Sequence, residues 1–226
     1  MKNFLPLLII VIFLNARAQQ KPSNPQGLKI DGFAAYMDSC KANTDNKLLE
    51  IKKFVPGVVL DIKYATTDNF MKRVMYKQAR AFARKPLVMQ LKKIQAALKP
   101  KGYGLKIFDA YRPYSVTLAF YEGASDKAFV ANPAKGSKHN RGCAVDLTII
   151  DLKTGLEIAM PTPYDSFARE AASEYAQLPA AVLENRKMLI DIMHKHGFRV
   201  IPNEWWHFDF KGWQRYDLLD IPFEKL

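Results

Sequence analysis

Helix-like and strand-like stretches of this chain follow one another without the regular strand, helix, strand alternation that builds a parallel sheet. Short stretches of alternating or β-branched residues, bounded by turn residues, predict strands at 58–64, 105–109, 144–150, 198–201 and 205–210. Helical patterns lie between some of these strands and not others. The sequence therefore predicts an α+β fold, a single domain with a small, largely antiparallel sheet flanked by helices.

Proline and glycine mark the ends of the clearest predicted helices. Pro86 stands at a helix start, apolar residues recur on one face from Leu87 to Leu98, and Gly102 follows as a stop. A second helix is predicted from Pro179 to about His196, with Gly197 as its stop. Residues 32–54 and the apolar stretch after Pro113 also have helical patterns.

The first residues have the pattern of a secretory signal peptide. Lys2 precedes an apolar run from Phe4 to Leu14, and Ala16 and Ala18 form a small-residue cleavage site. The run is shorter than the ~20 residues that span a bilayer, although a retained N-terminal anchor is the alternative. We expect a signal peptide over 1–18, a linker over 19–50 and one main domain over 51–226. The mature protein should then be exported, periplasmic or secreted, without stable membrane insertion.

Charge and cysteine content limit the choice of partners. The chain has 34 basic and 22 acidic residues, and removing Lys2 and Arg17 still leaves a net charge of about +10. An exported basic protein can be drawn to anionic envelope polymers, whereas nucleic acid is not an expected partner. Most of the basic residues are scattered, as on a solvated surface. The two cysteines, Cys40 and Cys143, can pair in an oxidising compartment, but the sequence does not give the distance between them.

Two segments concentrate residues that bind metals. The first contains His139 and Asp146, and the second contains Glu204 and His207. A catalytic zinc ion takes three protein ligands and leaves a fourth position for water, which the two histidines and Asp146 can provide. Glu204 is then the predicted proton acceptor beside the metal.

Strand geometry is an obstacle to this assignment. Residues three apart in a regular strand point to opposite faces, so Glu204 and His207 need an irregular strand, for which Pro202 and Asn203 provide a turn. The alternative is that His139 is a surface histidine and Asp146 an ordinary strand residue. Other residues in the region have simpler explanations: core packing for Trp205 and Trp206, and a helix C-terminus for His194 and His196.

Four segments together resemble the D-alanyl-D-alanine dipeptidases (VanX-like zinc peptidases). In chain order they are Asp61–Phe70, Asp109–Pro113, Ser137–Thr148 and Glu204–His207. The resemblance implies a zinc D-Ala-D-Ala peptidase-like fold that covers roughly residues 53–210. It implies one zinc ion per chain, bound by His139, Asp146 and His207, with Glu204 as the general acid and base.

The same resemblance implies roles for residues that bind the substrate. Arg112 would stabilise the tetrahedral intermediate, as a fixed guanidinium can do. The substrate's ammonium would be held by polar groups: Tyr64, Ser137 and Asp165. The expected substrate is a small D-amino-acid dipeptide, with cell-wall fragments as further partners. A D,D- or L,D-carboxypeptidase that trims peptidoglycan stems and a non-catalytic zinc domain are the alternatives, and Glu204 argues against the second.

Overall fold

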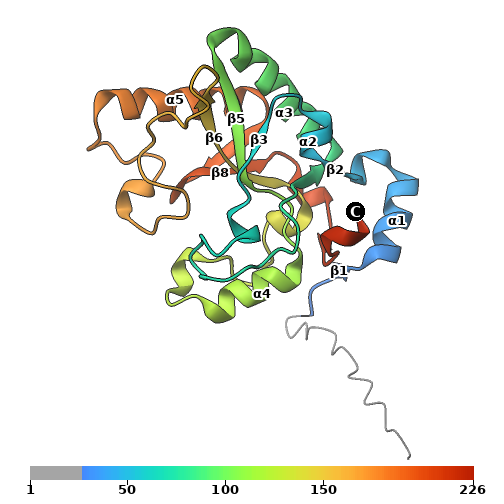
Figure 1. The fold of residues 1–226 in the computed structure, drawn as a ribbon. Coiled ribbons are helices and arrows are strands. Elements are labelled where there is room, and N and C mark those ends of the chain that lie inside the picture. The colour runs from blue at the N-terminus through green and yellow to red at the C-terminus, as the bar shows by residue number, and fades with distance from the viewer. Residues whose placement is uncertain (1–26) are drawn as a thin grey trace, which may run out of the picture.

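The computed structural model describes residues 27–226, and its centre is a five-stranded sheet (Figure 1). The predicted signal peptide lies outside the described residues. The strands, in sheet order, are β3 (Val59–Leu60), β5 (Tyr103–Asp109), β6 (Ala144–Asp151), β8 (Glu204–Phe210) and β7 (Phe198–Ile201). Only β3 and β5 pair in parallel, while the other neighbours are antiparallel. The predicted α+β fold with a largely antiparallel sheet is confirmed.

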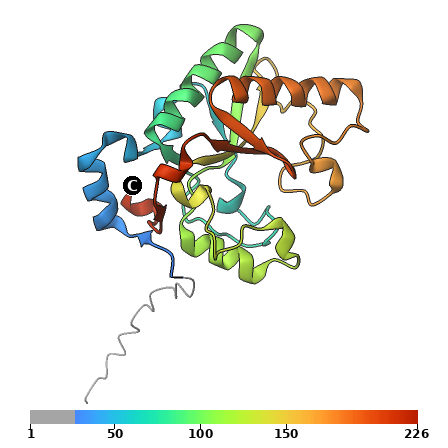
Figure 2. The ribbon, with the colours of Figure 1, turned by 180° about the vertical axis from the view of Figure 1, so that it is seen from behind.

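Two long helices lie on the same side of this sheet, as the view from behind shows (Figure 2). Helix α3 (Lys85–Leu98) packs against β5, and α5 (Ala180–Lys195) packs against β7 and β8. The predicted apolar face of α3 is confirmed, because four residues of that face are fully buried: Leu87, Leu91, Ile94 and Leu98. A shorter helix, α4 (Tyr114–Gly123), follows β5 directly and lies below the sheet in Figure 1.

The region 32–54 is not one helix, contrary to its pattern. It forms α1 (Phe33–Ala42), β2 (Leu48–Glu50) and the short α2 (Ile51–Phe54). The break follows α1, where the side chain of Asn43 accepts a hydrogen bond from the backbone N–H of Asp45. Asparagine and aspartate favour such local bonds over a continuing helix. The predicted strand 58–64 is also shorter, because a 3₁₀ turn over Lys63–Ala65 follows β3.

The segment before residue 50 packs against the body of the protein. Strand β1 (Ile30–Asp31) pairs in parallel with β9 (Leu218–Leu219), and β2 pairs with β4 (Phe82–Arg84). Tyr36 of α1 is buried, and its hydroxyl accepts a hydrogen bond from the backbone of Leu48. The linker boundary at residue 50 remains a prediction.

The two cysteines are both buried free thiols in the structure. Burial raises the pKa of the Cys143 thiol to about 12. Among residues 27–226, no helix has the length and apolar character needed to cross a bilayer.

Candidate active site

Three adjacent strands bring acidic and imidazole side chains into one row. Asp146 of β6 lies opposite Asp109 of β5 on one side and opposite His207 of β8 on the other. Residues directly opposite each other in antiparallel strands project from the same face of the sheet. Asp146 and His207 therefore face the same cavity, and the sheet register places a carboxylate beside an imidazole.

His139 reaches this row from a 3₁₀ turn, His139–Arg141, that precedes β6. The turn ends at Gly142, whose φ of +68° is in the left-handed region that favours glycine. A Cβ at this position would lie 2.5 Å from a methyl group of Leu48. Glycine is therefore required here both by backbone conformation and by space, and the compact turn directs His139 toward β6.

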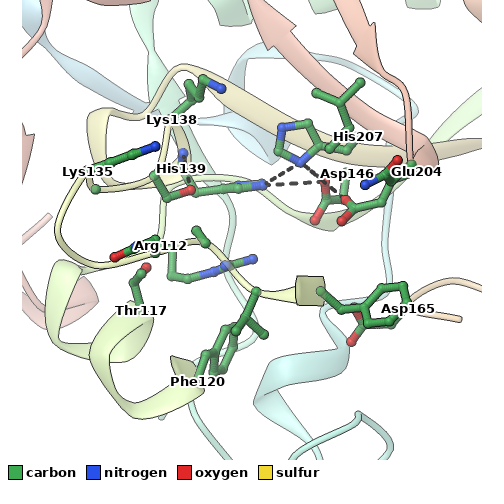
Figure 3. Close-up of a pocket in the computed structure, with 18 of the residues that line it drawn as sticks. Arg112, Thr117, Phe120, Lys135, Lys138, His139, Asp146, Asp165, Glu204 and His207 are labelled. Carbon is green, nitrogen blue, oxygen red and sulfur yellow. Dashed lines mark hydrogen bonds and ion pairs between the residues drawn. The ribbon is translucent and has the colours of Figure 1, made fainter. Parts of the chain in front are cut away.

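The two imidazoles and Asp146 present three lone pairs to a common point (Figure 3). The Nε2 atom of His139 lies 3.4 Å from Oδ1 of Asp146, and Nδ1 of His207 lies 3.1 Å from the same oxygen. The two nitrogens are 3.1 Å apart. Donor atoms around a tetrahedral zinc ion, with bonds of ~2.0–2.1 Å, are about 3.3 Å apart. The spacing in the structure therefore fits a single zinc ion.

The hydrogen bonds of the two imidazoles fix which nitrogen is free. His139 donates from Nδ1 to the carbonyl of Ala110 (2.6 Å), and His207 donates from Nε2 to Oδ1 of Asp209 (2.9 Å). When both imidazoles are neutral, the facing nitrogens are therefore both acceptors, and Oδ1 of Asp146 is buried without a hydrogen-bond partner among the described residues. Three convergent acceptors repel one another unless a cation lies between them.

The electrostatics of the cluster also favour an added positive charge. Burial alone lowers the pKa of His207, but the adjacent carboxylates of Asp146 and Asp209 outweigh this effect and raise the pKa to about 10. Burial would raise the pKa of Asp146, and the two imidazoles reverse this effect and lower it. A metal ion bound between these side chains would supply the positive charge that a proton on His207 supplies in its absence.

Sequence reasoning missed two residues that hold the ligands. Tyr164 donates a hydrogen bond to Oδ2 of Asp146 (3.0 Å), and Asp209 accepts the hydrogen bond of His207 while pairing with Lys138 (3.2 Å). Tyr164 precedes Asp165 and Asp209 follows His207 by two residues, so both stand next to residues that the sequence singled out. Their positions close to Asp165 and His207 in the sequence were the signal that could have identified Tyr164 and Asp209.

A β-bulge brings Glu204 to the same site. Val200 of β7 pairs with Phe208, but the next residue, Ile201, pairs with Glu204, so extra residues of β8 are accommodated here. Because of the bulge, Glu204 and His207 project toward the same site although they are three residues apart. Oε2 of Glu204 lies 3.7 Å from Nδ1 of His207. Burial raises the pKa of Glu204, and the positive charge of His207 opposes this shift.

Arg112 lies below the cluster in Figure 3, held in a fixed position. Its Nε and Nη2 both donate to Oδ2 of Asp109, at 3.0 and 2.7 Å. The guanidinium carbon is 4.6 Å from the ring centre of Phe120 and 5.4 Å from that of Tyr64. Asp109, which the sequence placed in the same segment as Arg112 without a role, therefore orients Arg112 and also accepts a hydrogen bond from Tyr76.

The three predicted ammonium-binding residues all line the same cavity, of about 440 Å³. The hydroxyl of Tyr64 donates to Oδ2 of Asp165 (2.9 Å). Asp165 has a φ of +64°, and burial raises its pKa to about 7 although the hydrogen bond from Tyr64 lowers it. Ser137 accepts a hydrogen bond from the backbone N–H of His139, so it also supports a predicted ligand.

The remaining aromatic and histidine residues lie as expected. Trp205 and Trp206 are both buried, and Trp206 lines the cavity. His194 and His196 stand at the C-terminus of α5, outside the cluster. The structure therefore brings together every predicted site residue, while their individual roles remain predictions.

Three lone pairs directed at one point beside a carboxylate and a fixed guanidinium are suited to metal-assisted hydrolysis, which uses all of these groups. The fold and the site define a metal-dependent hydrolase. Residues 44–222 match the family model Peptidase_M15, described as D-ala-D-ala dipeptidase. The chain belongs to this family, and the resemblance indicated by the four segments is confirmed.

Two relatives with the same activity in their names agree with the family match. The chain is 32% identical to the D-alanyl-D-alanine dipeptidase of Escherichia coli (strain K12), over 76% of this chain and 89% of that protein. It is 29% identical to the enzyme of the same name from Enterococcus faecalis, over 79% of this chain and 95% of that protein. Among solved structures, the LdcB LD-carboxypeptidase has a TM-score of 0.39 and 22% identity, over 59% of this chain and 62% of that chain.

Proposed function

We propose that this chain is a zinc-dependent dipeptidase that hydrolyses D-alanyl-D-alanine or a similar D-amino-acid dipeptide, with one zinc ion per chain. The observation that carries the proposal is the convergence of His139, Asp146 and His207 within 3.1–3.4 Å of one another, with the carboxylate of Glu204 beside them. The relatives reported above are named for this substrate.

Zinc, when bound by these three ligands, polarises the peptide carbonyl and makes a water molecule more acidic. Glu204 accepts a proton from the water as its oxygen attacks the carbonyl carbon. The carbon–nitrogen bond then breaks, and Glu204 returns the proton to the departing amine, so that two amino acids leave. Burial raises the pKa of Glu204, which makes the protonated carboxyl easier to form in the first step.

Arg112 binds the carbonyl oxygen as negative charge develops on it. The two hydrogen bonds to Asp109 and the rings of Tyr64 and Phe120 hold the guanidinium in place before the reaction. A donor that is already oriented costs no reorganisation when the charge appears, and removing such a donor typically slows catalysis by ~10²–10³.

Asp165 binds the ammonium group of the substrate, together with Tyr64 and Ser137. Tyr64 occupies only one oxygen of Asp165, which leaves the other oxygen for the ammonium. A longer peptide, blocked at this end by an amide, would leave the carboxylate unpaired in a half-buried site. This arrangement favours a dipeptidase over a carboxypeptidase.

Export of the protein belongs to the same proposal. The N-terminal signal pattern favours a periplasmic or secreted enzyme that takes dipeptides and cell-wall fragments from peptidoglycan turnover, without stable membrane insertion and without nucleic acid as a partner.

The test is hydrolysis by the purified mature protein of D-Ala-D-Ala and of a stem pentapeptide, with chelator, with zinc restored, and with Glu204→Ala. We expect only the dipeptide to be cut, in a reaction that requires zinc and Glu204. Cleavage of the pentapeptide alone would replace the proposal with a carboxypeptidase. A zinc-loaded protein that cuts neither peptide would indicate a binding domain.

A further inference from the structure

Among the described residues, one of the cations that line the cavity forms no ion pair or side-chain hydrogen bond. Four lysine and arginine side chains line it: Arg112, Lys135, Lys138 and Arg141. Arg112 is paired with Asp109, and Lys138 is paired with Asp209. The side chains of Lys138 and Arg141 also both lie over the ring of Trp213, at 5.4 Å. Within residues 27–226, the amino group of Lys135 makes no ion pair or hydrogen bond.

The backbone that carries Lys135 is nevertheless fixed. The N–H of Lys135 donates to the carbonyl of Asn132 (3.0 Å), and the side chain of Asn132 accepts from the N–H of Ala134. Gly136 follows with a φ of +68°, and a Cβ there would lie 2.6 Å from a methyl group of Leu218. The turn therefore holds Lys135 at the cavity wall while its side chain stays free.

Lys135 and Asp165 lie on opposite sides of the cavity in Figure 3, with Arg112 between them. Asp165 provides a carboxylate at one end, and Lys135 provides an amino group at the other. A free dipeptide is a zwitterion with its ammonium and carboxylate at opposite ends, separated by at most about 7 Å of extended chain. The charges of the cavity are complementary to those of such a substrate.

We propose that Lys135 binds the C-terminal carboxylate of the dipeptide, while Asp165 binds its ammonium, an inference that rests on the proposed function. The substrate would then lie in one direction only, with its scissile bond below the cluster of His139, Asp146 and His207. Arg112 is not the carboxylate receptor in this arrangement, because Asp109 and the rings of Tyr64 and Phe120 hold it beside the reacting carbonyl.

The experiment compares D-Ala-D-Ala with its C-terminal amide, which lacks the carboxylate, in the wild type, Lys135→Met and Lys135→Arg. We expect Lys135→Met to lower kcat/KM for the free acid by about 10-fold, mainly through KM, because one hydrogen bond to a charged group is lost. The amide should be cut equally well by the wild type and by Lys135→Met. Lys135→Arg should retain most of the preference for the acid.

Lys92→Met provides the matched control, because Lys92 is an exposed lysine of α3 that does not line the cavity. It removes the same charge and should leave both substrates unaffected. If Lys135→Met lowers the rates for acid and amide equally, or lowers neither in an active protein, the role of Lys135 is wrong while the proposed function stands. If the wild type cuts neither substrate, the proposed function itself fails, and with it this inference.

Discussion

Each predicted metal ligand has its own hydrogen-bond partner, which sets the orientation of the donor atom. Ala110 orients His139, Tyr164 orients Asp146 and Asp209 orients His207. Such partners fix the tautomer of an imidazole and raise its basicity, and their loss typically weakens metal binding by ~10–100-fold.

Asp209→Ala should therefore weaken zinc binding by about 10–100-fold, because His207 loses the acceptor that keeps its proton on Nε2. Asp209→Asn, which keeps an acceptor but loses the charge, should have a smaller effect. The measurement is competition for zinc with a chelating dye. Asp217→Ala is the control, since the side chain of Asp217 is half exposed and pairs with Lys29. Equal zinc affinities for Asp209→Ala and the wild type would contradict the proposed orientation of His207.

Asp165 should make folding stability depend on pH. Burial raises the pKa of Asp165 to about 7 in the folded chain, from an ordinary value of 3.8. The group therefore stabilises the fold when it is protonated, and this contribution is lost as pH rises through the window between the two values. In chelator, the free energy of unfolding of Asp165→Asn relative to the wild type should increase by about 1–3 kcal/mol between pH 5 and pH 8.

Chemical denaturation at the two pH values measures this difference. A buried charge that is kept despite its cost to stability is expected of a group that binds a cationic ligand. A difference in unfolding free energy that stays constant with pH would mean that the carboxyl of Asp165 has an ordinary pKa.

At the residue scale, the sequence predicted the groups whose chemistry is distinctive and missed the groups that hold them. His139, Asp146, Glu204 and His207 stand in short motifs of metal-binding residue types. Tyr164 and Asp209 are ordinary residue types, and their roles follow from the sheet register and from loop placement, which no local pattern encodes.

At the element scale, helices with clear ends were predictable and irregular strands were not. Helix α3 has Pro86 near its start, and α5 is followed by Gly197 with a φ of +87°. The sequence indicated only that β8 had to be irregular, because Glu204 and His207 had to face the same site, and it did not define the bulge itself. Its position depends on pairing with β7, which is a tertiary property.

The turn that carries His139 depends on Gly142. Gly142→Ala should destabilise the fold by about 1–3 kcal/mol, because the added Cβ meets Leu48 in addition to the unfavourable positive φ. Gly155→Ala is a matched control: it has a φ of +73° and open space around its Cβ, so only the backbone cost of about 1 kcal/mol applies. The measurement is the free energy of unfolding of both variants. Equal losses would show that Leu48 moves aside without cost.

At the scale of the whole molecule, the pairing of distant segments could not be predicted from the sequence. Strand β1 at Ile30 pairs with β9 at Leu218, and the side chains of Lys29 and Asp217 form an ion pair beside it. The two strands are only two residues long, which is too short for an alternating pattern to identify them. The fold class was predictable because it depends on the order of helices and strands along the chain. The pairing of β1 with β9 depends instead on tertiary packing between distant segments.

The proposed zinc ion should also stabilise the whole molecule. Its ligands come from the turn at His139, from β6 and from β8, so binding connects segments up to 68 residues apart in sequence. The unfolded chain lacks this preformed arrangement, and zinc at ~1,000 times its Kd would add about 4 kcal/mol to the free energy of unfolding. We expect the thermal midpoint to rise with zinc and fall with chelator. His139→Ala, which lacks one ligand, should show a much smaller shift, and equal shifts in this variant and the wild type would place the bound zinc elsewhere.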